Sequence, residues 1–191
     1  MKMASTLEFA ILGLLAQQPR SGYDLRKVFA STAMRHYSDS PGSIYPALRR
    51  LEERCWVVPV VNRSGASGRG RMPFGVTSKG RRELKAWLSA AVSLEDVAVR
   101  LEEVMLRFAF MDGNVPRQIA IRLLQAVEDG LTAQVKTYRA QRREMRAKLR
   151  EADGEVSQHT GVLAFEAGIE CLESRLAWAR RARARLTENS K

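Results

Sequence analysis

The chain has 191 residues, 45% of them hydrophobic, so it can bury the core of one or two small domains and is not a generally disordered polypeptide. Its formal net charge is +11, and residues 1–92 carry 15 Lys and Arg against 6 Asp and Glu, whereas residues 93–191 carry 17 against 15. A basic first half is what binding to a polyanion requires, although charge alone fits a soluble basic surface equally well.

Two short helices are expected at the start of the chain. The first begins at Ser5 or Thr6 and has Glu8 in its first turn. Its inward positions are Leu7, Ile11, Leu14 and Leu15. Pro19 interrupts it, and Ser21 is a suitable N-cap for the second helix. The inward positions of that helix are Leu25, Val28 and Phe29.

A third helix is expected over the sequence SIYPALRRLEER. Its apolar stripe consists of Ile44, Leu48 and Leu51, and the opposite side carries Ser43, Pro46, Arg49 and Arg50. Because proline has no N–H, Pro46 belongs in the first turn, which favours an N-cap at Ser43. A start at Ser40 would place Pro46 deeper and predict a kink. The hydroxyl and N–H groups of residues 40–45 suit a phosphate oxygen, and an apolar back with a small, basic front suits a DNA major groove.

Two strands, Trp56 to Val61 and Met72 to Val76, are predicted next. Pro59 makes the first of them an edge strand. The Gly- and Arg-rich segment between them can bend closely along DNA, where Arg69 and Arg71 would contact phosphates or the minor groove. Thr77 or Ser78 begins a fourth helix that runs to about Ala91. Lys79 lies near its N-terminus, where the helix dipole disfavours a cation and an external phosphate would stabilise it.

Residues 40–82 resemble the PadR family of bacterial transcriptional regulators. The resemblance rests on a small-residue turn, a Tyr-Pro-x-Leu core and a Leu-Glu end at Ser40, Gly42, Ser43, Ile44, Tyr45, Pro46, Leu48, Leu51 and Glu52. Further matches are Ser21-Gly22-Tyr23-Asp24-Leu25 before this segment and Thr77, Lys79, Gly80 and Arg81 after it. The family has glycine where this chain has Cys55, and a left-handed backbone there would cost a residue with a side chain about 1 kcal/mol.

The resemblance and the exposed face of the third helix together define the expected DNA contacts. They are Tyr23, Ser40, Gly42, Ser43, Tyr45, Pro46, Arg49, Arg50, Arg69, Arg71 and Lys79. Tyr45 fits a core aromatic equally well, because its position relative to the apolar stripe is lateral.

The second half is expected to be helical. Val97, Leu101, Val104, Phe108 and Met111 predict one amphipathic helix, which Asp112-Gly113-Asn114 ends. One helix more than 50 Å long is expected from Val115 to Glu151, and a last helix carries apolar residues from Val162 to Leu186 at steps of three and four. Such stripes need a partner. The resemblance implies a second copy of the chain, and an intramolecular helical hairpin is the alternative.

The predicted fold is mainly α: residues 1–92 form a winged helix-turn-helix with a two-stranded β wing, and residues 93–191 form a helical dimerisation domain. No signal peptide or membrane span is expected, because the apolar run at residues 9–16 is too short and lacks a cleavage pattern. Cys55 and Cys171 lack disulfide-framework or zinc-ligand spacing, as is typical of a reducing compartment, so a cytoplasmic protein without metal or cofactor is predicted. His36 and His159 belong to no catalytic motif.

The sequence thus predicts a transcriptional regulator, not an enzyme. The resemblance implies a homodimeric repressor that binds an inverted-repeat operator and responds, in some members, to a small aromatic or lipophilic effector. A sequence-nonspecific architectural DNA-binding protein is the alternative, and a scaffold that binds another protein is a third hypothesis.

Overall fold

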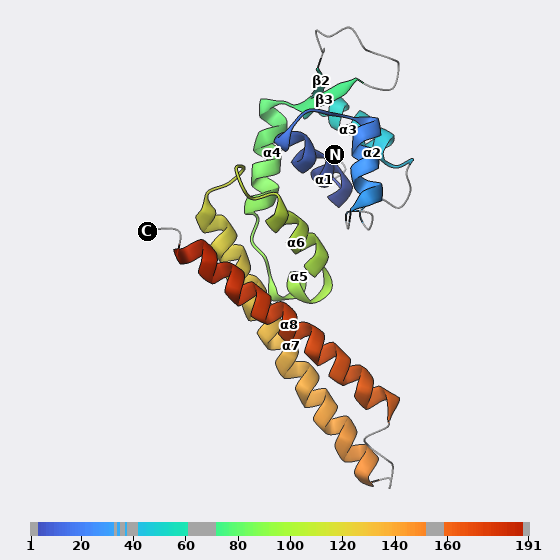
Figure 1. Cartoon of the computed structure of the whole chain (residues 1–191), viewed down its shortest axis with the longest axis vertical. Coiled ribbons are helices and arrows are strands. Elements are labelled where there is room, and N and C mark those ends of the chain that lie inside the picture. Colours follow the sequence, from blue (N-terminus) through green and yellow to red (C-terminus); the bar gives the residue numbers. More distant parts are fainter. Residues whose placement is uncertain are drawn as a thin grey trace. The chain divides into compact units, whose positions relative to one another are not determined.

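The computed structural model of the chain divides into two compact units (Figure 1). It describes residues 4–32, 34, 37, 42–60, 72–151 and 159–188. The first unit comprises residues 1–90 and 109–115, and the second comprises residues 91–108 and 116–191. Residues 109–115, which the sequence analysis assigned to the second domain, therefore cluster with the first unit.

Among its described residues, four α-helices and a small sheet build the first unit, which is a winged helix-turn-helix. The helices are α1 (Thr6–Gln17), α2 (Gly22–Ser31), α3 (Ile44–Glu53) and α4 (Ser78–Ser89). The strands are β1 (Arg20–Ser21), β2 (Val57–Pro59) and β3 (Pro73–Val76), arranged in the antiparallel order β1-β3-β2. The sequence analysis missed β1, because a two-residue strand has no periodicity to detect. Pro59 lies on an edge strand, as predicted, opposite Phe74.

Helix α1 lies at the centre of the first unit. Ser5 and Glu8 form a capping box at its start, and consecutive residues Ala10, Ile11 and Leu12 are fully buried. Phe9 of this helix stacks on Trp87 of α4 with ring centroids 4.7 Å apart. Leu7, predicted as an inward residue, is half-buried.

Helix α3 begins and ends where the sequence predicted. It starts after Ser43, so Pro46 is its third residue, although Ser43 makes no capping hydrogen bond with its side chain. At the other end Cys55 adopts φ +58°. The N–H of Cys55 bonds the carbonyl of Glu52 at 2.8 Å, and the N–H of Trp56 bonds that of Leu51 at 2.9 Å. This is a Schellman motif built without the usual glycine, so Cys55 adopts the left-handed backbone at the cost that the sequence analysis gave for a residue with a side chain.

The second unit begins with two short helices where one was predicted. They are α5 (Leu94–Val99) and α6 (Leu101–Ala109), separated by Arg100, whose backbone leaves the helical region at φ −129° and ψ +31°. Val97 and Val104 are both buried. The apolar spacing therefore continues across the break, which is why periodicity alone predicted a single helix.

Two long helices, α7 (Arg117–Glu151) and α8 (Thr160–Glu188), pack side by side as a hairpin (Figure 1). The 35 residues of α7 give a length of about 52 Å, as predicted. Ion pairs join Glu128 to Arg183, Arg139 to Glu173 and Arg146 to Glu166, so the partners run backward along α8 as α7 runs forward.

The hairpin corrects one argument from the sequence. Val162, Ile169, Leu176 and Ala179 of α8 are buried within this chain, where the sequence analysis assigned the apolar seam of α8 to a second copy. The intramolecular alternative accounts for that seam. Among the described residues, no helix combines the length and apolar character that a membrane span requires.

Candidate DNA-binding surface

Helix α2 starts at a capping box. This box explains why the acidic Asp24 lies close to the basic residues Arg20 and Lys27. The Ser21 hydroxyl accepts from the Asp24 N–H at 3.2 Å, and the Asp24 carboxylate accepts from the Ser21 hydroxyl at 2.6 Å and from its N–H at 3.1 Å. The hydroxyl bond and then the backbone bond lower the pKa of Asp24, helped by the charges of Arg20 and Lys27. Asp24 is thus a structural carboxylate that fixes the start of α2.

Tyr45 and Gly22 bring the starts of α2 and α3 together. A Cβ at Gly22 would lie 2.6 Å from Cε1 of Tyr45, so only glycine leaves room for the ring at this place. Tyr45 nevertheless keeps 46% of its surface exposed. The ring is therefore neither a core aromatic nor a free side chain: one face packs on the α2 backbone and the rest faces solvent. The contact joins the Ser-Gly-Tyr-Asp motif at residues 21–24 to the Tyr-Pro motif at residues 45–46. Neither motif alone predicts it, because the two are distant in sequence.

The exposed side of α3 presents Tyr45, Pro46 and Arg49. Ile44, Ala47, Leu48 and Leu51 are buried on the opposite side, as the apolar stripe predicted. Within the part of the chain that the structure describes, the Arg49 side chain makes no hydrogen bond or ion pair. Its guanidinium is thus available to a phosphate or a guanine edge.

Arg50 lies in a different environment from its neighbour. Its Nε donates to Oε1 of Glu8 at 2.5 Å, and the Glu8 side chain is only 2% exposed. Arg54, one turn later, places Nη1 3.4 Å from Glu8 Oε2. The sequence analysis treated Arg49 and Arg50 alike, but the structure ties Arg50 to the core of its unit while leaving 45% of its side chain exposed. The sequence analysis placed Glu8 in the first turn of α1 and did not predict that its carboxylate faces α3. The capping box with Ser5 accounts for only one of its contacts.

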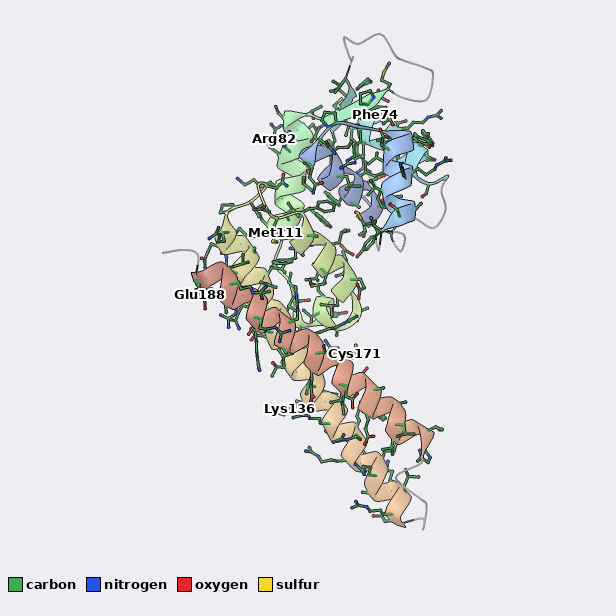
Figure 2. All side chains as sticks on the ribbon, in the orientation of Figure 1. Phe74, Arg82, Met111, Lys136, Cys171 and Glu188 are labelled. Atoms are coloured by element: carbon green, nitrogen blue, oxygen red, sulfur yellow. The ribbon has the colours of Figure 1, made fainter. Side chains whose placement is uncertain are left out.

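The other predicted contact residues fall into two groups. Tyr23, Gly42 and Lys79 are exposed, Ser43 is half-buried, and Arg26 lies 5.6 Å from the Tyr23 ring centroid as a cation–π partner that the sequence analysis did not select. Ser40, Arg69 and Arg71 lie outside the described residues. Lys79 is joined on α4 by exposed basic residues, which include Arg82 (Figure 2).

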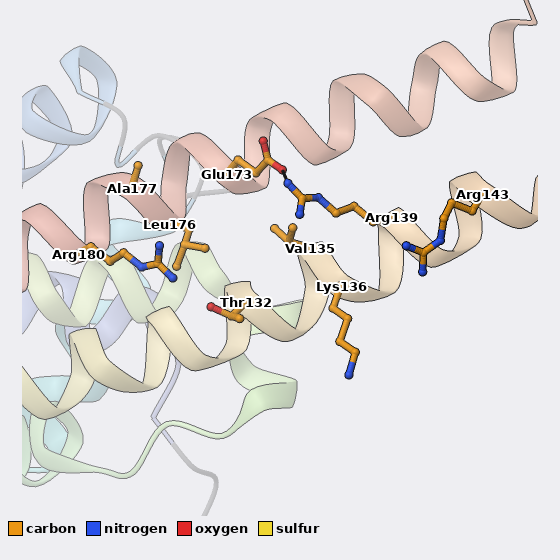
Figure 3. Close-up of a pocket in the computed structure, with 9 residues that line it drawn as sticks. All are labelled: Thr132, Val135, Lys136, Arg139, Arg143, Glu173, Leu176, Ala177 and Arg180. Atoms are coloured by element: carbon orange, nitrogen blue, oxygen red, sulfur yellow. Dashed lines mark hydrogen bonds and ion pairs between the residues drawn. The ribbon is translucent and has the colours of Figure 1, made fainter. Parts of the chain in front are cut away.

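The described part of the second unit carries at least three grooves, and two of them differ in character. One, of about 580 Å³, runs between α7 and α8 and is crossed by the ion pair of Arg139 and Glu173 (Figure 3). Lys136 lies at its edge and points away from α8 (Figure 3). The other groove, of about 430 Å³, is more apolar, and its lining includes Leu101, Met105, Val127, Leu131 and Trp178.

Residues 11–86 match the model of the transcriptional regulator PadR-like family. The chain is 32% identical over 82 residues to the negative transcriptional regulator PadR of Bacillus subtilis (strain 168), an alignment that covers 43% of this chain and 44% of that protein. The chain thus matches less than half the length of this curated relative.

Solved structures are similar at lower identity. Bacillus subtilis PadR in complex with operator DNA is 23% identical with a TM-score of 0.42, covering 94% of this chain and 98% of that one. The same protein with p-coumaric acid is 21% identical with a TM-score of 0.42, covering 98% of each chain. The PadR-like regulator BC1756 of Bacillus cereus is 22% identical with a TM-score of 0.37, covering 90% of this chain and 94% of that one.

Proposed function

We propose that the chain is a homodimeric repressor that binds an inverted-repeat operator. This proposal builds on its place in the PadR-like family of transcriptional regulators. The observation that carries this proposal is the exposed face of α3, where Tyr45, Pro46 and Arg49 lie opposite a fully buried stripe. A helix with such a face can enter a major groove without losing its own packing. Arg49 would then donate to a guanine edge or a phosphate.

The remaining contacts would position this helix. Tyr23 and the backbone N–H groups at the start of α3 suit phosphate oxygens, and Lys79 suits a phosphate beside α4. Arg69 and Arg71 would contact the flanking minor groove or its phosphates. Two copies would place their α3 helices in successive major grooves about 34 Å apart, and bound protein would occlude RNA polymerase.

The second copy is proposed to dock on the face of α8 that points away from its buried seam. Leu163 and Trp178 are large, apolar and exposed by 48% and 37%, and Ala167, Cys171 and Ser174 between them are exposed and small. Small residues between apolar ones let two helices approach closely. This exposed face, unlike the buried seam, is the one that we propose a partner covers.

An effector is proposed to bind the apolar groove of the second unit. Leu101, Met105 and Trp178 would cover an aromatic or lipophilic molecule. Trp178 belongs both to this groove and to the proposed dimer face. An occupant would therefore change the contact between copies and the separation of the two α3 helices, which releases operator.

Selection of binding sites from a random DNA pool tests the proposed function. The full-length protein should enrich an inverted repeat whose half-sites are centred about 10 base pairs apart. Enrichment of no sequence, with tight binding to all DNA, would instead support the architectural alternative. The Arg49→Ala variant is the matched control, since it removes one exposed cation from α3 and should lose the enrichment.

A further inference from the structure

We propose that Glu8 is a positioning residue for DNA reading: from α1 it holds Arg50 and Arg54 and so fixes how α3 meets the major groove. This inference rests on the proposed function, because it assumes that α3 is the reader. Under this proposal the two adjacent arginines have different roles. Arg49 contacts DNA, and Arg50 orients the helix that carries Arg49.

The contacts of Glu8 use both oxygens of one buried carboxylate. Oε1 accepts from Arg50 Nε at 2.5 Å. Oε2 accepts from the Ser5 N–H at 3.1 Å and lies 3.4 Å from Arg54 Nη1. A buried carboxylate is stable only when its oxygens are satisfied in this way. One side chain therefore joins the start of α1 to the last turn and the C-cap of α3.

The cluster continues to the base of the wing. The guanidinium carbon of Arg54 lies 5.1 Å from the ring centroid of Trp56, whose side chain is buried. The Trp56 carbonyl accepts from the Thr77 N–H at 3.0 Å, at the start of α4. Glu8 thus holds the end of α3 that leads into β2, so a tilt about this end would displace the exposed residues nearer the start of the helix.

Capping alone does not require a glutamate at this position. Ser21 with Asp24 and Ser93 with Asp96 form the same capping box with the shorter acid. The extra methylene of Glu8 is what reaches α3. An aspartate at position 8 would keep the cap and the charge but would fall short of Arg50.

The pairing also withholds one cation from the phosphates. Glu8 offsets the charge of Arg50, whereas Arg49 has no ion-pair partner among the described residues. Removing the Glu8 charge should free Arg50 to move to a phosphate, which raises binding to any DNA. Loss of positioning should lower binding to operator alone.

The test measures affinity for the selected operator and for random DNA over a range of salt. Glu8→Asp and Glu8→Gln are compared with wild type, and Asp96→Asn in α5 serves as a control that removes a capping acid far from α3 in sequence. Both Glu8 variants should lose at least tenfold in the ratio of operator to random affinity. In Glu8→Gln the salt slope on random DNA should steepen by about 0.9, the value for one more phosphate contact. The control should keep the wild-type ratio and slope.

Either of two results in the Glu8 variants would overturn the proposal. One is a wild-type ratio in both Glu8 variants. The other is an equal loss on operator and random DNA together with a lower melting midpoint, which would mean that Glu8 only stabilises the fold. If Glu8→Gln does not fold, Arg50→Gln replaces it in the test. In that variant Glu8 still accepts from the Ser5 N–H and still pairs with Arg54, so its carboxylate stays satisfied. That variant should lose operator affinity with an unchanged salt slope, and a slope flattened by about 0.9 would show that Arg50 contacts phosphate and would equally overturn the proposal.

Failure of the proposed function has a separate signature. If selection with wild-type protein returns no operator, the function itself fails and the role of Glu8 falls with it. If wild type binds an operator and the Glu8 variants behave like it, only the positioning role is lost.

Discussion

Breaking the contact between Gly22 and Tyr45 is expected to leave the fold intact. Gly22 is the first residue of α2, and no positive φ is required of it. A Cβ there would lie 2.6 Å from Tyr45 Cε1 and 3.2 Å from two further ring atoms. Carbon atoms prefer about 3.5–4.0 Å, so the ring must move by about 1 Å. Because 46% of Tyr45 is exposed, the ring can turn outward.

The Gly22→Ala change should therefore affect stability and DNA binding in different ways. Alanine favours the helix by up to about 1 kcal/mol over glycine, and the displaced ring offsets part of that gain. We expect an unfolding free energy that is unchanged or slightly higher, with operator affinity at least tenfold lower because Tyr45 no longer faces the groove. Urea denaturation and gel-shift titration measure the two quantities.

A double-mutant cycle with Tyr45→Ala checks the cause. In the Tyr45→Ala background the ring is gone, so Gly22→Ala should give its full helix-propensity gain and no further loss of affinity. Equal losses of affinity from Gly22→Ala in both backgrounds would refute the link to Tyr45. So would a single Gly22→Ala variant that binds operator like wild type.

Cys55→Gly should raise the unfolding free energy by about 1 kcal/mol, because Cys55 adopts φ +58°, and equal urea midpoints would contradict strain at this residue. Asp24 has a lowered pKa in the folded chain, so its contribution to stability is present above the ordinary value of 3.8 and is lost as pH falls below it. Asp24→Asn should consequently flatten the loss of stability in acid, and an unchanged acid profile would argue against the capping box as its source. Wild type should sediment at about twice 21.5 kDa and Leu163→Glu/Trp178→Glu as a monomer, whereas an unchanged dimer mass in the variant would exclude this face of α8.

Local chemistry made much of the first unit predictable. Pro46 fixed the start of α3, since a residue without an N–H fits only the first turn, and the structure places the helix accordingly. Ser21 and Thr77 cap their helices because their hydroxyls can reach an orphan N–H two or three residues later. Each of these predictions depends on residues close together in sequence.

Contacts between distant residues were not predictable in the same way. Arg50 lies on the polar side of α3, and nothing in the helical pattern indicates that Glu8, 42 residues earlier, is buried beside it. The seam of α8 showed that a helical partner was needed but not which one, because a stripe on one helix fits a second chain and a hairpin equally well. Arg100 breaks a helix without disturbing the apolar spacing around it.

The most direct measurement of the central claim is the sequence discrimination of Arg49→Ala. Arg49 is exposed and makes no ion pair with a described residue, so the change should leave the melting midpoint and the mass in solution as they are in wild type. If α3 reads the operator, affinity for the selected operator should fall at least tenfold, about 1.4 kcal/mol, and more than affinity for random DNA. A folded Arg49→Ala protein that binds its operator with wild-type affinity would mean that α3 is not the reader.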